Sequence, residues 1–209
     1  MGYGIAASAL RGGHSVWGVD INAAQMKRFV EEGGQATELN AAAGDLDTAI
    51  VAVLNAPQTE TVLFGADGIV PKLKAGAAVL ACATVPPDFA KSMAAQCAEY
   101  GVHYLDAPIS GGSVKAANGQ LSIMAAGTAK AFIAVRPVLA SIAETVFELG
   151  DEAGAGSAMK AVNQLLAGVH IATMAEAMTF GMTQGVTPEK FIDVMSKCAG
   201  TIWMLENRA

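Results

Sequence analysis

Apolar runs of strand length alternate with stretches of helix length over the first 150 residues. The segment "TAIVAVL" (48–54) is continuously apolar, as expected of a strand that is buried on both faces of a sheet. The same pattern predicts further strands at 15–20, 77–84, 102–108 and 121–127, and helices near 2–12, 22–34, 58–66, 86–99 and 129–143. Regular alternation of this kind predicts an α/β fold with a doubly wound, mostly parallel sheet.

The pattern changes near residue 150, after which no strand is predicted. Residues 154–184 read as one helix, about 45 Å long at 1.5 Å per residue, and a second helix is expected at about 188–198. Thr187 would cap that second helix and Pro188 would sit in its first turn. We therefore predict two domains, with a Rossmann-like nucleotide-binding fold at 1–152 and, at 153–209, a long interdomain helix followed by the start of an all-α domain.

The ends of the sequence do not match a complete protein of this kind. The chain begins with a helix that leads into a strand, with no strand in front of it, and it stops just after a helix. We expect a chain truncated at both ends, with the first strand missing and the second domain incomplete.

Composition and charge exclude several classes of function. The net charge of −6 gives no electrostatic reason to expect nucleic acid, and 6% aromatic residues leave little for base stacking. The apolar runs contain too much Gly, Thr and charge for a membrane span, so no membrane partner is expected. Three widely spaced cysteines (Cys82, Cys97 and Cys198) predict buried thiols in a reducing cytoplasm. No His or Cys cluster indicates a metal site.

The first candidate for chemistry lies at the N-terminus. Gly2 stands at the head of a helix, a strand follows, and Asp20 ends that strand 18 residues later (20 − 2 = 18). This is half of a dinucleotide-binding fingerprint, in which the acid binds ribose hydroxyls. A packing glycine and a strand-terminal acid would look the same. If the site exists, a carboxylate there repels a 2′-phosphate and favours NAD over NADP.

Two further candidates lie far apart in the sequence. In "DAPISGG" (106–112), Ser110 with the amides of Gly111 and Gly112 could bind a carboxylate at the edge of the sheet, or could form a plain tight turn. Lys160, Asn163 and Gln164 share one face of the long helix in apolar surroundings. They are either a solvated polar stripe, or a general acid/base lysine with amides that orient a substrate.

Together these segments resemble the beta-hydroxyacid dehydrogenase family, which is related to 6-phosphogluconate dehydrogenase. "DAPISGG" resembles its substrate-binding signature, and "GAGSAMKAVNQLLAG" (154–168) its catalytic-lysine segment. "MGYGIAASALRGGHSVWGVD" (1–20) resembles its nucleotide motif, entered at the final Met-Gly. The resemblance covers essentially the whole chain and implies a cytoplasmic, NAD-dependent oxidoreductase that is homo-oligomeric when complete.

The resemblance also implies residue roles. Those that would contact NAD are Gly2, Asp20, Asn55 and Thr84; the family usually has Ser-Thr where this chain has Ala-Thr at 83–84. Ser110, Gly111 and Gly112 would hold the substrate carboxylate, and Asn163 and Gln164 would position the substrate. Lys160 would take the hydroxyl proton as hydride leaves the adjacent carbon.

Within the family, the segments "NQLLAGVHIATMAEAMTFG" and "AGTIWMLENR" are most similar to the L-threonate dehydrogenase branch, which oxidises a four-carbon sugar acid at C2. That branch tends to carry Asn-Ser where this chain has Thr201 and Ile202, a change that favours a less hydroxylated acid. The alternatives are 3-hydroxyisobutyrate or tartronate semialdehyde chemistry, and a catalytically inactive member that binds nucleotide.

Overall fold

The structure is a computed structural model, and residues 1–36 and 42–208 are described. The chain forms two compact units, Met1–Lys160 and Ala161–Ala209. The first is an α/β unit with parallel strands, as the alternating pattern predicted, and the second is helical in its described part. The predicted fold class is confirmed.

Three parallel strands form the centre of the first unit. They are β3 (Thr48–Val51), β4 (Ala78–Ala81) and β5 (His103–Asp106), hydrogen-bonded in that order. Their register places Val51 beside Ala81, and Ala81 beside Asp106. The carboxyl ends of all three strands therefore meet at one edge, the place where open α/β sheets bind ligands.

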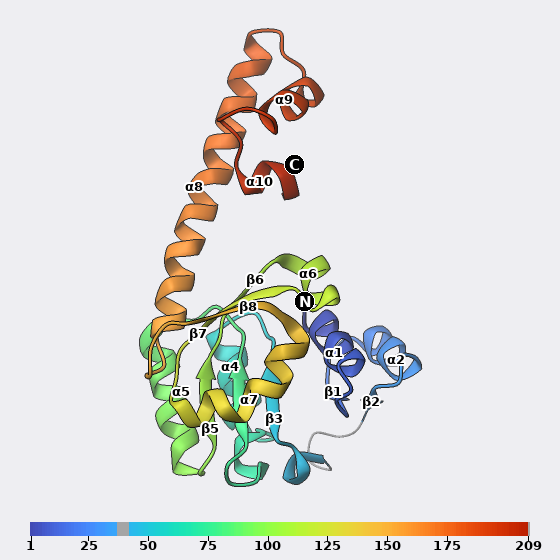
Figure 1. The fold of residues 1–209 in the computed structure, drawn as a ribbon, viewed down its shortest axis with the longest axis vertical. Coiled ribbons are helices and arrows are strands. Elements are labelled where there is room, and N and C mark those ends of the chain that lie inside the picture. The colour runs from blue at the N-terminus through green and yellow to red at the C-terminus, as the bar shows by residue number, and fades with distance from the viewer. Residues whose placement is uncertain (37–41, 209) are drawn as a thin grey trace. The chain divides into compact units, whose positions relative to one another are not determined.

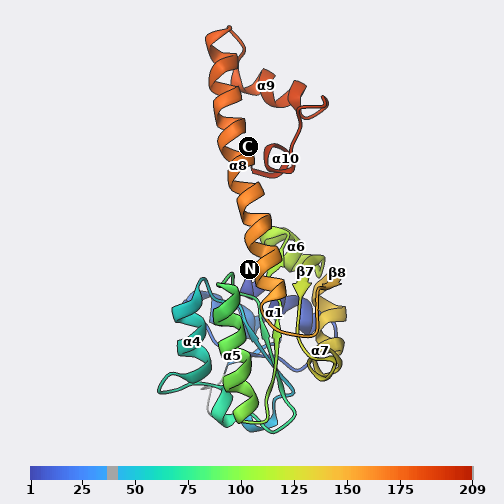
Figure 2. The ribbon, with the colours of Figure 1, turned by 90° about the vertical axis from the view of Figure 1, so that its left-hand side faces the viewer.

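Alternate residues of these strands pack into two separate hydrophobic clusters. Val79 of β4 packs with α4 (Ala56–Phe64) and α5 (Pro87–Glu99), whereas its neighbour Leu80 packs with α1 (Gly2–Arg11) and α7 (Ala129–Ile142). Figure 2 shows α4 and α5 on one side of the strands and α7 on the other. Because both faces are covered, the strands are mainly apolar, which is why they could be predicted.

The remaining strands flank this centre. β1 (Trp17–Gly18) pairs in parallel with β2 (Gln35–Ala36), and α2 (Ala23–Glu31) connects them. β6 (Ile109–Ser110) pairs antiparallel with β7 (Leu121–Ala125), which pairs in parallel with β8 (Ala143–Glu148). A backbone bridge between Asp106 and Ala126 links this second group to β5. Short 3-10 helices at Ala43–Asp45 and Val70–Lys72 complete the connections.

Helix α6 and strand β8 are among the elements that were not predicted. Helix α6 (Gly112–Asn118) begins at the second glycine of the Ser-Gly-Gly turn, where two adjacent glycines conceal the helix signal. Strand β8 contains only half-buried and exposed residues, and they do not alternate, so its sequence carries no clear buried face. Helix α6 directly follows the predicted substrate turn, and β8 is joined through β7 to β6, which contains Ser110 (Figure 1).

Helix α8 (Ala155–Thr183) is the long helix predicted at 154–184, and its first six residues belong to the first unit. The second unit continues with α9 (Pro188–Met195) and α10 (Trp203–Arg208). Thr187 caps α9, since its hydroxyl oxygen accepts a hydrogen bond from the Lys190 amide at 3.3 Å, and Pro188 is the first helical residue. The cap predicted from the Thr-Pro pair is confirmed.

Two expectations need correction. Helix α8 is long and apolar enough to cross a membrane by length and composition: an 18-residue window of it has a mean hydropathy of 1.3, and Lys160 and Glu176 are the helix's two charged residues. The core helix of a soluble protein passes the same criterion. Of the cysteines, Cys82 and Cys97 are buried as expected, and burial raises the pKa of each thiol to about 12. Cys198, however, is exposed.

Candidate active site

Lys160 lies at the end of the first unit, on the second turn of α8. Its side chain is buried, with 7% of the residue exposed, and its Nζ donates a hydrogen bond to the Ile109 carbonyl oxygen at 2.9 Å. Burial lowers the pKa of the Lys160 ammonium below its ordinary value. An amine in this setting loses its proton more readily than a surface lysine and can then accept one. The polar-stripe alternative therefore does not hold for Lys160.

The hydrogen bond to Ile109 brings two distant motifs together. Ile109 immediately precedes Ser110 in "DAPISGG", 51 residues before Lys160. The lysine amine is thus held against the backbone of the segment that the sequence analysis singled out for the substrate carboxylate. The predicted base therefore lies beside the predicted carboxylate-binding turn.

The Ser-Gly-Gly turn needs its glycines for backbone reasons. Gly111 and Gly112 have φ angles of +131° and +77°, a region that favours glycine. A Cβ at Gly111 would lie 2.9 Å from the Cβ of Lys115. Ser110 and both glycines are half-buried, so the turn is neither covered by the core nor fully solvated. The turn is a tight connection into α6 and is also partly exposed at the surface.

A buried carboxylate joins the same segment to the start of α8. Asp106 is 0% exposed, and its Oδ2 accepts hydrogen bonds from the backbone amides of Gly154 and Ser157, at 2.9 and 2.8 Å. Its Oδ1 accepts a third, from the Ser157 hydroxyl, at 2.6 Å. This role was not predicted from the sequence. The only available signals were an acid that ends a buried strand and a Gly-Ala-Gly-Ser stretch before the lysine.

The four expected cofactor residues lie at the starts of helices or just after strands. Gly2 is the first residue of α1, and Asp20 follows β1, its side chain accepting a 2.8 Å hydrogen bond from the Asn22 amide. Asn55 follows β3 and caps α4, since its Oδ1 accepts from the Gln58 amide at 3.0 Å. Thr84 is exposed between β4 and α5.

The chemistry of these residues is suited to contact with a dinucleotide cofactor. The exposed carboxylate of Asp20 is an acceptor for ribose hydroxyls, and Asn55 and Thr84 place polar side chains after two adjacent parallel strands. Asn55 also has a structural role as a helix cap, which the sequence analysis did not separate from cofactor contact. Cofactor binding by these residues stays a prediction.

Asn163 and Gln164 belong to the second unit. The Asn163 amide donates to the Gln164 side-chain oxygen at 3.1 Å, and Gln164 is exposed. Their expected contact with substrate stays a prediction.

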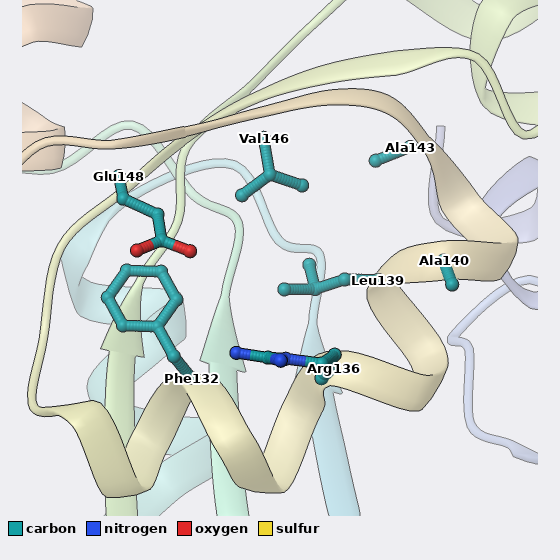
Figure 3. A pocket seen from close by; sticks show the side chains of 7 residues that line it. All are labelled: Phe132, Arg136, Leu139, Ala140, Ala143, Val146 and Glu148. Atoms are coloured by element: carbon teal, nitrogen blue, oxygen red, sulfur yellow. The ribbon is translucent and has the colours of Figure 1, made fainter.

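A surface groove lies away from these residues, between α7 and β8 (Figure 3). It is about 220 Å³ in volume and is apolar except for Arg136 and Glu148. Figure 3 shows the Glu148 carboxylate beside the Phe132 ring. The volume is below the range of about 300–1,000 Å³ typical of small-molecule sites, so we do not assign the groove to catalysis.

Both parts of the chain match known families. Residues 1–150 match the NAD-binding domain of 6-phosphogluconate dehydrogenase. Residues 154–209, which include the whole of α8, match the family described as the NAD-binding domain of NADP-dependent 3-hydroxyisobutyrate dehydrogenase. The second match places α8 within a dehydrogenase family, which favours a helix that packs within the protein over a helix that spans a membrane.

Individual relatives agree with the family matches. The chain is 46% identical to an L-threonate dehydrogenase of Cupriavidus necator over 209 residues, which covers all of this chain and 70% of that protein. It is 32% identical to a 3-hydroxyisobutyrate dehydrogenase of Pseudomonas aeruginosa, covering 98% of this chain and 69% of that one.

A solved structure of similar fold is the 3-hydroxyisobutyrate dehydrogenase of Salmonella typhimurium. It superposes with a TM-score of 0.94 at 42% identity, covering 99% of this chain and 73% of that one. Sequence and fold together place this chain in the beta-hydroxyacid dehydrogenase family, and it is a hydroxy acid oxidoreductase by descent.

Proposed function

We propose that this protein is an NAD-dependent dehydrogenase that oxidises a small hydroxy acid similar to L-threonate at C2. The observation that carries the proposal is the buried Lys160 amine, hydrogen-bonded to the residue that precedes the Ser-Gly-Gly turn. The similarity to L-threonate dehydrogenases of several bacteria supports the substrate class.

Each residue has a distinct task in the proposed mechanism. Ser110 and the amides of Gly111 and Gly112 bind the substrate carboxylate, and Asn163 and Gln164 orient the rest of the molecule. The neutral amine of Lys160 accepts the hydroxyl proton, the C–H bond breaks, and the carbon–oxygen double bond of the 2-oxo acid forms. NAD, when bound, takes up the hydride that leaves that carbon. Lys160 carries one more proton at the end of the step, which it must release to solvent before the next turnover.

We propose NAD over NADP because of Asp20. Its exposed carboxylate follows β1, where a 2′-phosphate would meet a negative charge, whereas ribose hydroxyls would find an acceptor. Asp20→Asn should lower the ratio of kcat/KM with NAD to kcat/KM with NADP, because the negative charge that a 2′-phosphate would meet is removed. A wild-type preference for NADP would contradict this assignment.

The substrate is tested by a panel of hydroxy acids with NAD. We expect turnover of L-threonate, or of a less hydroxylated four-carbon acid that carries a hydroxyl at C2, to exceed that of 3-hydroxyisobutyrate and of the reduced form of tartronate semialdehyde. A site that hydrogen-bonds a substrate hydroxyl rejects analogues that lack it, by up to about 10⁴–10⁵-fold. A preference for 3-hydroxyisobutyrate would favour the second candidate, to which the chain is similar at 32% identity.

An inactive, nucleotide-binding member is the remaining alternative. It would bind NAD in calorimetry and turn over none of the acids. The intact Lys160 and Ser-Gly-Gly turn count against it. We further expect a cytoplasmic homo-oligomer, which size-exclusion chromatography with light scattering would test.

A further inference from the structure

The start of α8 is tied to the segment 106–109 at two points, one turn apart. Asp106 accepts hydrogen bonds from Gly154 and Ser157, and Ile109 accepts one from Lys160. Ser157 and Lys160 are three residues apart on the helix, so they lie on the same face. The start of α8 and the segment 106–109 are therefore joined by hydrogen bonds at two places, and Lys160 makes one of these bonds.

The contact at Asp106 is buried and specific. Asp106 and Ser157 are 0% and 1% exposed, and all three hydrogen bonds end on one carboxylate. The first amides of a helix have no partner within the helix, and a carboxylate at this position satisfies them and complements the helix dipole. The carboxylate thus determines where and in which direction α8 begins.

Close packing reinforces that position. A Cβ added at Gly156 would lie 2.4 Å from the Met124 carbonyl oxygen and 2.7 Å from that of Asp106. The first turn of α8 therefore lies directly on the backbone of two strand ends, and it has no room to shift while the hydrogen bonds to Asp106 are intact.

We propose that Asp106 is a positioning residue, whose buried carboxylate fixes the first turn of α8 through Gly154 and Ser157 and so holds the Lys160 amine against Ile109, beside Ser110. Asp106 itself touches neither substrate nor cofactor in this role. The catalytic consequence depends on the proposed function, whereas the anchoring of Lys160 does not. The test therefore reads the lysine directly, so that absence of dehydrogenase activity would leave the result interpretable.

The experiment measures how fast Lys160 reacts with isotope-labelled formaldehyde under reducing conditions, in the folded 209-residue chain. The exposed Lys27, whose side chain is 81% accessible, serves as internal reference in the same peptide digest. Asp106→Ala removes all three acceptor contacts and should raise the relative reactivity of Lys160 about tenfold; Ser157→Ala removes one and should raise it about two- to fivefold. In the double variant Asp106→Ala/Ser157→Ala, the relative reactivity of Lys160 should be little higher than in Asp106→Ala alone, because both changes break the same hydrogen-bond network.

Asp106→Asn separates positioning from a direct effect of charge. Its side-chain oxygen can accept from both amides, and its NH₂ can donate to the Ser157 hydroxyl, so all three contacts can be remade. We expect Lys160 to react at close to the wild-type rate, and more slowly than it does in Ser157→Ala. Asp151→Asn makes the same change at an exposed acid three residues before Gly154 and should have no effect.

Two controls keep the result decisive. Leu63→Ala opens the fully buried core beneath α4 and lowers stability without touching α8, so it should leave Lys160 reactivity unchanged. If Asp106→Ala does not fold, Ser157→Ala and Asp106→Asn decide. The proposal is overturned if Ser157→Ala leaves the relative reactivity of Lys160 unchanged, or if Asp106→Asn, while folded, exposes Lys160 as much as the removal of the Ser157 hydroxyl does or more.

Discussion

Two glycine turns lie close to Lys160 along the hydrogen-bonded network, and they differ in what surrounds them. The Ser-Gly-Gly turn at 110–112 is half-buried and leads into α6. In the Gly-Ala-Gly-Ser turn at 154–157, both glycines and the serine are buried, and its amides are used by Asp106. The first turn is partly exposed where the substrate is predicted to bind, whereas the second donates two of its amides to Asp106.

The difference shows why similar sequences can have unlike roles. A glycine beside a site can be required by a ligand, by the backbone angle or by a neighbouring backbone. Gly111 has a positive φ, and Gly156 has no space for a side chain. Accessibility is what separates the two cases, and it is a property of the folded chain.

The largest effect is expected at Lys160, which lies close to both turns along the hydrogen-bonded network. Lys160→Met keeps the length of the side chain but removes the amine, and it should lower kcat for the preferred hydroxy acid about 10²–10⁴-fold, the usual contribution of a general base. NAD affinity, measured by calorimetry, should change little. A kcat within tenfold of wild type would show that another group takes the proton.

The second-largest effect concerns the buried turn. Gly156→Ala should lower the free energy of unfolding by about 2 kcal/mol, because its Cβ meets two backbone carbonyl oxygens that cannot move apart easily. Gly168→Ala in the same helix is the matched control, since nothing lies within 4 Å of the added Cβ; it should stabilise by up to about 1 kcal/mol. Equal effects in denaturant unfolding would remove the distinction between the two glycines.

A smaller effect on stability, together with an effect on substrate binding, is expected at the accessible turn. Gly111→Ala places a Cβ on a residue with a φ of +131° and should cost about 1–2 kcal/mol of unfolding free energy. It should also raise KM for the hydroxy acid more than it lowers NAD affinity. Gly44→Ala, with open space around the added Cβ, should be nearly neutral. An unchanged KM would mean that the turn is only a connection.

The smallest effect concerns the pH dependence of stability. Burial lowers the pKa of Lys160 in the folded state, so between that pKa and its unfolded value of about 10.4 the unfolded chain binds more protons. Lys160 therefore contributes a free energy of unfolding that increases as pH rises through this window. Lys160→Met should flatten the dependence, whereas Lys27→Met, at an exposed site, should not. Parallel curves for the two variants in urea titrations would contradict the burial effect.

The sequence was sufficient to predict the fold for a physical reason. The strands at the centre are buried on both faces and therefore read as apolar runs in the sequence. Thr187 followed by Pro188 indicated the start of a helix, which is α9. Helix α6 was missed because its glycines hide it, and β8 because it is not clearly one-sided. The role of Asp106 could not be predicted, since its partners lie 48 and 51 residues away and only tertiary packing brings them together.

The site could be predicted only as a set of parts. Lys160 and the Ser-Gly-Gly segment were singled out separately, and the hydrogen bond from Lys160 to Ile109 joins them in one unit. For Asn55, the sequence could not distinguish a helix cap from a ligand contact, since a side-chain oxygen after a strand is suited to both.

The most direct test of the account is the pH dependence of kcat for oxidation of the preferred hydroxy acid. If the buried Lys160 amine is the base, kcat should rise with pH through a single group whose pKa lies below that of an ordinary lysine, because only the neutral amine accepts the proton. This limb should be absent from the residual activity of Lys160→Met. A wild-type kcat that begins to rise only in the range of an exposed lysine, or a limb that persists in Lys160→Met, would contradict the account.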